Sequence, residues 1–269
     1  MGALMNVAHL KHVHREPLHE AAEGATAIAV CNLTVAYNRH PAVHHLTGQF
    51  REGSLTALCG PNGGGKSSLL KAIVGLAPIA SGHVDIAAAR KRAIAYLPQV
   101  VEVDRGFPLK VLDVADLGHW RRSGAFGRLT AAHRQQSLAA LAAVGLQGLE
   151  ARPIEALSVG QFQRLLFARL IVEDAPIILL DEPFNAIDQR TTEDLLRLIV
   201  AWSNEGRTVV AAIHDLDMAR RAFPEALLIA REPIAWGETG DVLGDANLAR
   251  ARGLSEGWLE NAPVCEVPA

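Results

Sequence analysis

Residues 60–68 read GPNGGGKSS, and this stretch decides the fold. It fits the pattern G-x-x-x-x-G-K-[ST] of a phosphate-binding loop, which lies between a strand and a helix. An apolar run, SLTALC at 54–59, precedes the loop, and a helix is predicted over 65–75 after it. The glycines let backbone N–H groups turn toward phosphate oxygens, and the helix N-terminus adds a positive dipole. The stretch therefore predicts a nucleotide phosphate site.

Each residue of this loop is a candidate for nucleotide binding. Lys66 can reach the β- and γ-phosphates, and the Ser67 hydroxyl suits Mg²⁺. The alternative is a glycine-rich turn with a chance Lys-Ser, and the strand and helix predicted on either side argue against it. The candidate residues are Gly60, Pro61, Asn62, Gly63, Gly64, Gly65, Lys66, Ser67 and Ser68.

Strand-like and helix-like stretches alternate outward from the loop. Apolar residues recur in a β-like pattern at 26–37 and 42–50. Strands that alternate with helices imply a mostly parallel sheet covered on both faces. The predicted fold class is therefore α/β: a P-loop NTPase core with a mostly parallel sheet, an N-terminal antiparallel β subdomain and an inserted α-helical subdomain. The later predicted elements are helix 159–172, strand 176–181, helix 189–203, strand 208–214, a short helix and strand 226–230.

The stretch from about 101 to 156 differs from its surroundings in the spacing of its apolar residues. LKVLDVADLGHW and TAAHRQQSLAALAAVGL carry Ala and Leu at i, i+3 and i+4, which predicts helices. A helical insertion thus interrupts the α/β core. We expect a folded domain over 26–245, a His-rich flexible tail over 1–25 and a C-terminal tail over 246–269.

Two carboxylates end the predicted strand in PIILLDEP at 176–183. Sheets of this kind place their ligands at the carboxyl ends of the strands. Asp181 suits Mg²⁺, directly or through water, and Glu182 suits a general base that polarises an attacking water. A strand that ends in a solvated acidic turn is the alternative. His214 ends the next strand and is either a plain strand terminus or a group that contacts the γ-phosphate or orients the water.

A second anion-binding turn follows in LSVGQFQR at 157–164, where Ser158, Gly160 and Gln161 open a predicted helix. Two more residues are candidates by position. Gln99 lies where the core gives way to the insertion, so that it is either a solvated turn or a Mg²⁺-sensing hinge. Tyr37 ends an early strand and is either a core or surface aromatic or a ring that stacks on a base.

The phosphate loop, Gln99, LSVGQ, DEP and His214, in that order, resemble the nucleotide-binding subunits of ATP-binding cassette (ABC) transporters. The resemblance covers roughly residues 26–240. It implies that ATP and Mg²⁺ are the cofactors, that Glu182, His214 and Gln99 serve catalysis, and that Ser67, Gln99 and Asp181 hold Mg²⁺. It also implies a head-to-tail dimer with a second copy of the chain. Ser158 and the Gly160 N–H would then contact the γ-phosphate bound by the partner, with Gln161 in the same turn.

The chain departs from the commonest family pattern at two places. Val159 stands where Gly is usual, and FNAID replaces the frequent Ser-Ala-Leu-Asp, although Asp188 matches. Ser158, Gly160 and Gln161 remain, so a working turn is expected. Asn185 leaves the detail of communication between subunits open.

The stretches VDRGFPLKVLDVADLGHW and ALSVGQFQRLLFARL resemble the ATPases of zinc- and manganese-type importers. This resemblance implies integral-membrane permease partners, an extracytoplasmic metal-binding protein acting indirectly, and a peripheral location on the cytoplasmic face of the membrane. Phe107 and Trp120 either contact the permease or fill the core of the insertion. The alternatives are an ATPase subunit of an ABC transporter for another substrate, such as an iron chelate or other solute, and a soluble ABC ATPase not coupled to a membrane.

Composition sets the remaining limits. The net charge of −3 over 269 residues gives no general attraction to nucleic acid, and no apolar run reaches the roughly 18 residues of a membrane helix. Three cysteines, which are few, odd in number and unclustered, argue against a disulfide framework. The N-terminal tail carries His9, His12, His14 and His19, whose spacing defines no closed tetrahedral site. The tail is either a weak, adaptable metal binder or a solvated segment of biased composition.

Overall fold

The computed structural model describes residues 25–38, 40–87, 94–99, 104–124 and 128–260. The chain divides into two compact units. The described residues of the larger unit fall within 21–96, 176–183 and 200–269, and those of the smaller unit within 97–175 and 184–199. We describe each unit by itself.

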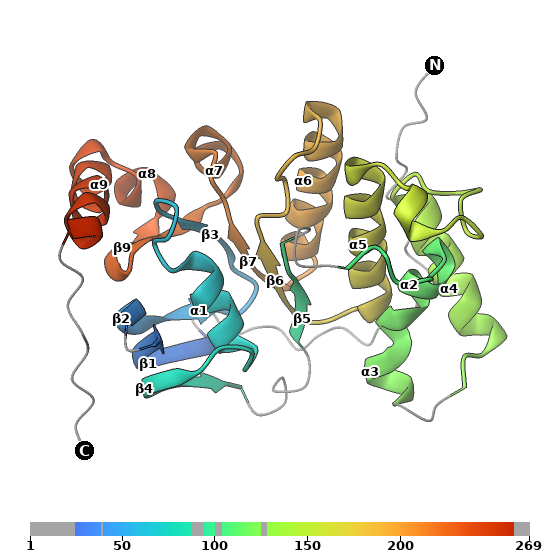
Figure 1. The fold of residues 1–269 in the computed structure, drawn as a ribbon, viewed down its shortest axis with the longest axis horizontal. Coiled ribbons are helices and arrows are strands. Elements are labelled where there is room, and N and C mark those ends of the chain that lie inside the picture. Colours follow the sequence, from blue (N-terminus) through green and yellow to red (C-terminus); the bar gives the residue numbers. More distant parts are fainter. Residues whose placement is uncertain (1–24, 39, 88–93, 100–103, 125–127, 261–269) are drawn as a thin grey trace. The chain divides into compact units, whose positions relative to one another are not determined.

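A six-stranded mixed sheet forms the centre of the larger unit, in the order β5-β6-β7-β3-β8-β9 (Figure 1). The pairs β6–β7, β7–β3 and β3–β8 are parallel, and β9 runs antiparallel to β8. Every residue of β3, β6 and β7 is buried, as their uninterrupted apolar runs predict for strands covered on both faces. The strands are β3 (Leu55–Cys59), β5 (Ile94–Leu97), β6 (Ile177–Asp181), β7 (Thr208–Ala212), β8 (Glu225–Ala230) and β9 (Glu232–Glu238).

A three-stranded antiparallel sheet in the order β2-β1-β4 completes the sheet structure of this unit. It consists of β1 (Thr26–Tyr37), β2 (His40–Arg51) and β4 (Ile79–Ile86). One apolar core joins this sheet, helix α1 (Lys66–Ile73) and strands β6, β7 and β8. Phe50 belongs to this core and packs its ring against Trp236 of β9 at 4.6 Å between centroids. The core therefore fixes the helix that begins in the phosphate loop.

Helices make up the smaller unit, and α5 (Val159–Glu173) lies at its centre (Figure 1). Both α2 (Val111–Asp116) and α4 (Ala131–Ala143) pack on it, as does the short helix η4 (Leu117–His119). A Cβ at Gly118 would lie 2.6 Å from the carbonyl oxygen of Arg169, so only glycine permits this approach of η4 to α5. The remaining helical segments are α3 (Trp120–Ser123) and η5 (Ile154–Ala156).

The predicted fold class is confirmed, with three refinements. The helical unit is larger than the insertion at 101–156, because it also takes in α5 and the first part of α6 (Gln189–Asn204). Strand β9 was not predicted. The expectation of a C-terminal tail from residue 246 is wrong for its first part, because helix α9 (Asp245–Glu260) forms there. Leu248 and Ala251 of this helix are buried.

Two further helices, α7 (Leu216–Ala222) and α8 (Thr239–Val242), belong to the larger unit. None of the helices in the described part of the chain is both long enough and apolar enough to cross a membrane.

Candidate functional site

The phosphate loop connects β3 to α1, as the sequence predicts. Gly60, Gly64 and Gly65 of this loop leave too little room for a Cβ, and the closest approaches are at Gly60 and Gly65. A Cβ at Gly60 would lie 1.9 Å from the carbonyl oxygen of Ile229, and one at Gly65 would lie 2.2 Å from that of Ala42. Gly65 also adopts φ +97°, a left-handed conformation that favours glycine. The loop therefore packs against the ends of β8 and β2, with its backbone wound into the first turn of α1.

Lys66 lies at the base of this loop and is buried. Its ammonium group donates to the carbonyl oxygens of Gly60 at 2.9 Å and Pro61 at 3.0 Å. Desolvation lowers the pKa of Lys66, while the negative charges of Glu182 and Asp181 act in the opposite direction. The first turn of α1 adds backbone N–H groups that have no partner within the helix. Together they make a compact anion-binding site.

Strand register brings the acidic residues to the same place. Asp181, the last residue of β6, pairs with Ala212 of β7, and Ala212 pairs with Leu58 of β3. The three strands are parallel, so the residues that follow them leave the sheet at one edge. The phosphate loop, Glu182 and His214 follow these strand ends, which places all three at the edge predicted for ligands.

Asp181 receives two hydrogen bonds. The Ser67 hydroxyl donates to its Oδ1 at 2.9 Å, and the Tyr96 hydroxyl donates to its Oδ2 at 3.3 Å. Burial raises the pKa of Asp181; the hydrogen bond from Ser67 acts in the opposite direction, and the charge of Glu182 adds to the rise. Tyr96 was not a sequence candidate, because its role depends on the pairing of β5 beside β6.

Glu182 and His214 contact each other directly. The Nε2 atom of His214 and the Oε1 atom of Glu182 form a hydrogen bond, and the Glu182 side chain is mostly buried. Glu182 has φ +50°, a left-handed conformation that is strained for a residue with a side chain. Strain of this kind is commonly held at functional sites. A buried carboxylate is thus oriented by an imidazole beside the phosphate loop.

Tyr37 also belongs to the larger unit. Its side chain is 43% exposed, so it is not a core aromatic. Tyr37 pairs with His40 at the closed end of the β1–β2 hairpin. Ala42, two residues after His40, is the residue whose carbonyl oxygen packs against Gly65. The Tyr37 ring is therefore exposed at the end of the hairpin whose second strand contacts the phosphate loop.

The second turn lies in the smaller unit, where Ser158 caps α5. The Ser158 hydroxyl accepts from the Gln161 N–H at 3.1 Å, and the Gln161 side chain accepts from the Ser158 N–H at 3.0 Å. This is a capping box, and it leaves the hydroxyl proton of Ser158 able to donate. Val159 is 40% exposed and takes no part in the cap, so this departure leaves the turn intact.

Two further features support this turn. Arg105 donates to the carbonyl oxygens of Ile154 and Leu157, just before Ser158, and stacks over the Phe162 ring at 4.9 Å. Asp188 caps the first turn of α6 through Thr191, and its Oδ2 lies 3.8 Å from where a Cβ would stand on Gly160. Arg105 was not a sequence candidate, because its partners lie about fifty residues away.

The remaining sequence candidates lie in the smaller unit or outside the described residues. Gln99 is half-buried and belongs to the smaller unit, with Ser158, Gly160 and Gln161. His9, His12, His14 and His19 lie outside the described residues. The larger unit therefore brings together the phosphate loop, Asp181, Glu182 and His214.

Asp181 provides a test of this electrostatic arrangement. Folding raises the pKa of Asp181, so the charged carboxylate lowers the free energy of unfolding at any pH above the folded-state pKa. This destabilisation disappears below the ordinary aspartate pKa of about 3.9, where the group is protonated in both states. We expect Asp181→Asn to raise the free energy of unfolding at neutral pH without nucleotide, and the gain to shrink as the pH approaches about 4. Urea denaturation over this pH range measures the difference. The exposed Asp217→Asn is the control, and an Asp181→Asn variant less stable than the parent at neutral pH would contradict the expectation.

Known proteins agree with this geometry. The ABC transporter family model matches residues 43–185. The manganese transport system ATP-binding protein MntB of Bacillus subtilis is 38% identical over 239 residues, which cover 87% of this chain and 96% of that protein. The zinc transport system ATP-binding protein TroB of Treponema pallidum is 35% identical over 238 residues, covering 87% and 90%.

A solved structure gives the same result. An ABC transporter of metal-chelate type in an inward-facing conformation is similar with a TM-score of 0.75 and 28% identity, over 85% of this chain and 89% of that one. The family match spans the phosphate loop and the carboxylates that end β6. The chain therefore belongs to the ABC transporter family and is one of its ATP-binding, ATP-hydrolysing proteins.

Proposed function

We propose that the chain is the ATPase subunit of an importer for a divalent metal ion such as zinc or manganese. The observation that carries the hydrolytic part is the contact between His214 and Glu182 at the sheet edge that also holds Lys66. The names of the manganese and zinc transport relatives support the metal. The similar metal-chelate transporter supports a chelated metal as the second candidate substrate.

Hydrolysis follows from the positions of these groups. Loop N–H groups and Lys66 hold the phosphates and stabilise the charge that develops on them. Glu182 takes a proton from the water whose oxygen attacks the γ-phosphorus, while the bond to the β,γ-bridging oxygen breaks and leaves ADP and phosphate. His214 orients the carboxylate through the hydrogen bond to Oε1. The exposed ring of Tyr37 offers a surface for the adenine base.

The residues present fit Mg²⁺. Ser67 and Asp181 offer hard oxygen donors that already touch at 2.9 Å, and the raised pKa of Asp181 reports a buried carboxylate that a nearby cation would stabilise. Ser67 and Asp181 would hold the ion, and the Gln99 amide oxygen stays a predicted further ligand. Bound with ATP, Mg²⁺ would neutralise charge on the β- and γ-phosphates.

The two anion-binding turns argue for a head-to-tail dimer. Ser158 is exposed, and the cap uses its hydroxyl oxygen only as an acceptor, so the hydroxyl can still donate to an anion at the start of α5. The phosphate loop already provides one anion-binding helix start in the larger unit. A second copy of the chain would give each Ser158 and Gly160 a γ-phosphate bound by the other subunit, with Gln161 holding the turn through its capping hydrogen bonds.

The insertion provides a surface for the permease. Phe107 is 62% exposed and Trp120 is 59% exposed, so neither fills the core of the smaller unit. Aromatic side chains of this kind are frequent anchors in protein interfaces. The chain would then work at the cytoplasmic face of the membrane, held there by its permease and served indirectly by an extracytoplasmic metal-binding protein.

Glu182→Gln tests the chemistry. The amide keeps the shape of the side chain but cannot accept the proton, so we expect ATP binding to persist and turnover to fall by roughly 100- to 10,000-fold. Nucleotide binding and phosphate release measure the two effects. Glu238→Gln, at the exposed end of β9, is the matched control. A Glu182→Gln enzyme with near-parental turnover would exclude Glu182 as the base.

Paired heterodimers test the arrangement of the two turns. One heterodimer combines a Lys66→Ala chain with a Ser158→Arg chain, and the other combines the parent with a Lys66→Ala, Ser158→Arg double variant. If Ser158 acts on the partner's nucleotide, only the first heterodimer has an intact site and hydrolyses ATP. If Ser158 acts within its own chain, only the second does. Purification through two different tags followed by an ATPase assay distinguishes the results.

Phe107→Ala tests coupling to the permease. Loss of an interface anchor costs about 2 kcal/mol, which is roughly a 30-fold loss of affinity. We expect unchanged ATPase activity of the isolated subunit and strongly reduced permease binding and metal uptake. Leu76→Ala, which removes a similarly exposed apolar side chain from the larger unit, is the control. Normal uptake by the Phe107→Ala variant would remove Phe107 from the contact.

A further inference from the structure

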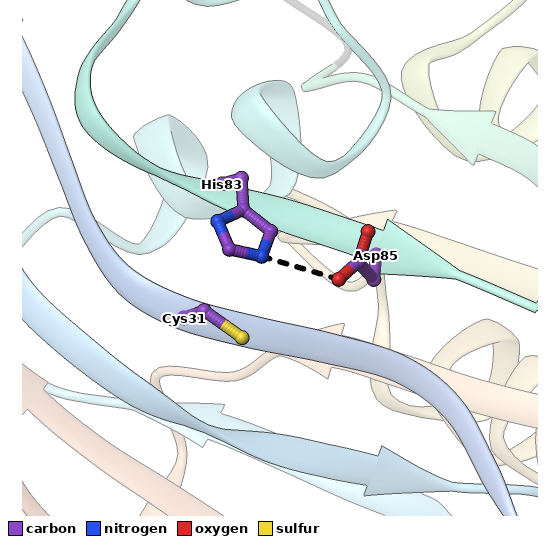
Figure 2. A group of neighbouring side chains, drawn as sticks. All are labelled: Cys31, His83 and Asp85. Atoms are coloured by element: carbon purple, nitrogen blue, oxygen red, sulfur yellow. Dashed lines mark ion pairs between the residues drawn. The ribbon is translucent and has the colours of Figure 1, made fainter.

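A second group of ligand-type side chains lies in the antiparallel sheet of the larger unit. Figure 2 shows Cys31 on β1 beside His83 and Asp85 on the neighbouring β4. One possible ligand atom from each of the three residues lies within 4.8 Å of the other two. We propose that Cys31, His83 and Asp85 form a binding site for a zinc-like divalent cation. The proposal does not depend on the transport function.

The register of the sheet creates this group. Cys31 pairs with His83 directly across the two strands, and Asp85 lies two residues beyond His83 on the same face of β4. Val84 and Ile86, the alternate residues of β4, pack on the apolar core. His83 and Asp85 therefore point to solvent, while the opposite face of β4 packs on the apolar core.

The distances between the three ligand atoms suit tetrahedral coordination of a metal ion once the side chains move slightly closer together. With zinc–ligand bonds of about 2.0–2.3 Å, tetrahedral geometry separates neighbouring ligand atoms by roughly 3.4–3.6 Å. The Nε2 atom of His83 already lies 3.2 Å from the Oδ2 atom of Asp85. Their side chains are 63% and 65% exposed, so each can rotate with little steric opposition. The half-buried Cys31 supplies the fixed third ligand, and water can take the fourth position.

The ligand set selects the ion. A thiolate with an imidazole and one carboxylate favours zinc over the harder Mn²⁺ and Mg²⁺, which prefer oxygen ligands. Binding converts the Cys31 thiol into a metal thiolate and releases its proton to solvent, so affinity falls as the pH is lowered. None of the three residues belongs to the nucleotide site. The bound ion would join β1 to β4 and raise the melting temperature by binding only the folded chain.

Zinc titration of the full chain tests the site. We expect calorimetry to find one more zinc site in the parent than in Cys31→Ser. For His83→Gln and Asp85→Asn we expect affinity to fall by at least about tenfold, the lower end of what even outer-shell changes cost. His40→Gln, on β2, and Cys265→Ser are the matched controls and should retain the site. Identical titrations of the parent and Cys31→Ser would overturn the proposal, and equal affinity for Mn²⁺ and Zn²⁺ would overturn the assigned selectivity.

Cobalt substitution separates this site from the N-terminal histidines. A Co²⁺–thiolate bond gives a near-ultraviolet charge-transfer band, and residues 1–24 contain no cysteine. Burial raises the pKa of Cys59 to about 12, which opposes thiolate formation there. We expect the band in the parent and in Cys265→Ser and its loss in Cys31→Ser. A band that survives in Cys31→Ser, or no band in the parent, would overturn the proposal.

Discussion

One line of strand register determines the chemistry of this protein. Leu58, Ala212 and Asp181 are neighbours across three parallel strands, so the chain leaves the sheet at the same level three times. The three exits begin the phosphate loop and carry Glu182 and His214. A shift of β6 by one residue would turn Glu182 toward the opposite face, because successive side chains alternate across a sheet. In the mechanism proposed above, the buried residues that hold β3, β6 and β7 in register are therefore as necessary to hydrolysis as the polar groups that follow these strands.

The sequence predicts this edge well because its signals are local. The glycines around Lys66 and the carboxylates after an apolar strand each lie within a few residues of the element they begin or end. Residues that act through distant partners were missed. Tyr96 reaches Asp181 only because β5 lies beside β6, and Arg105 reaches the Leu157 carbonyl across some fifty residues. The extent of the helical unit was underestimated for the same reason, since α5 joins it through packing that no local pattern reports.

Two anion-binding helix starts are built by different means. The phosphate loop needs glycine because neighbouring carbonyl groups leave no room for a side chain at Gly60 and Gly65. The turn at Ser158 uses side chains instead, in a reciprocal pair of hydrogen bonds with Gln161. The second design tolerates Val159, whose side chain lies outside those bonds. Arg105 also donates to the Leu157 carbonyl, so another segment of the smaller unit contacts the residue just before the turn.

The left-handed backbone at Glu182 sets stability against activity at a single position. A residue with a side chain pays about 1 kcal/mol or more for this conformation, whereas glycine adopts it freely. If Glu182 is the base in the mechanism proposed above, Glu182→Gly would relieve the strain and at the same time remove the group that activates the water. Engineering of this protein for thermal stability should therefore leave Glu182 unchanged, because the substitution that relaxes its backbone also removes its carboxylate.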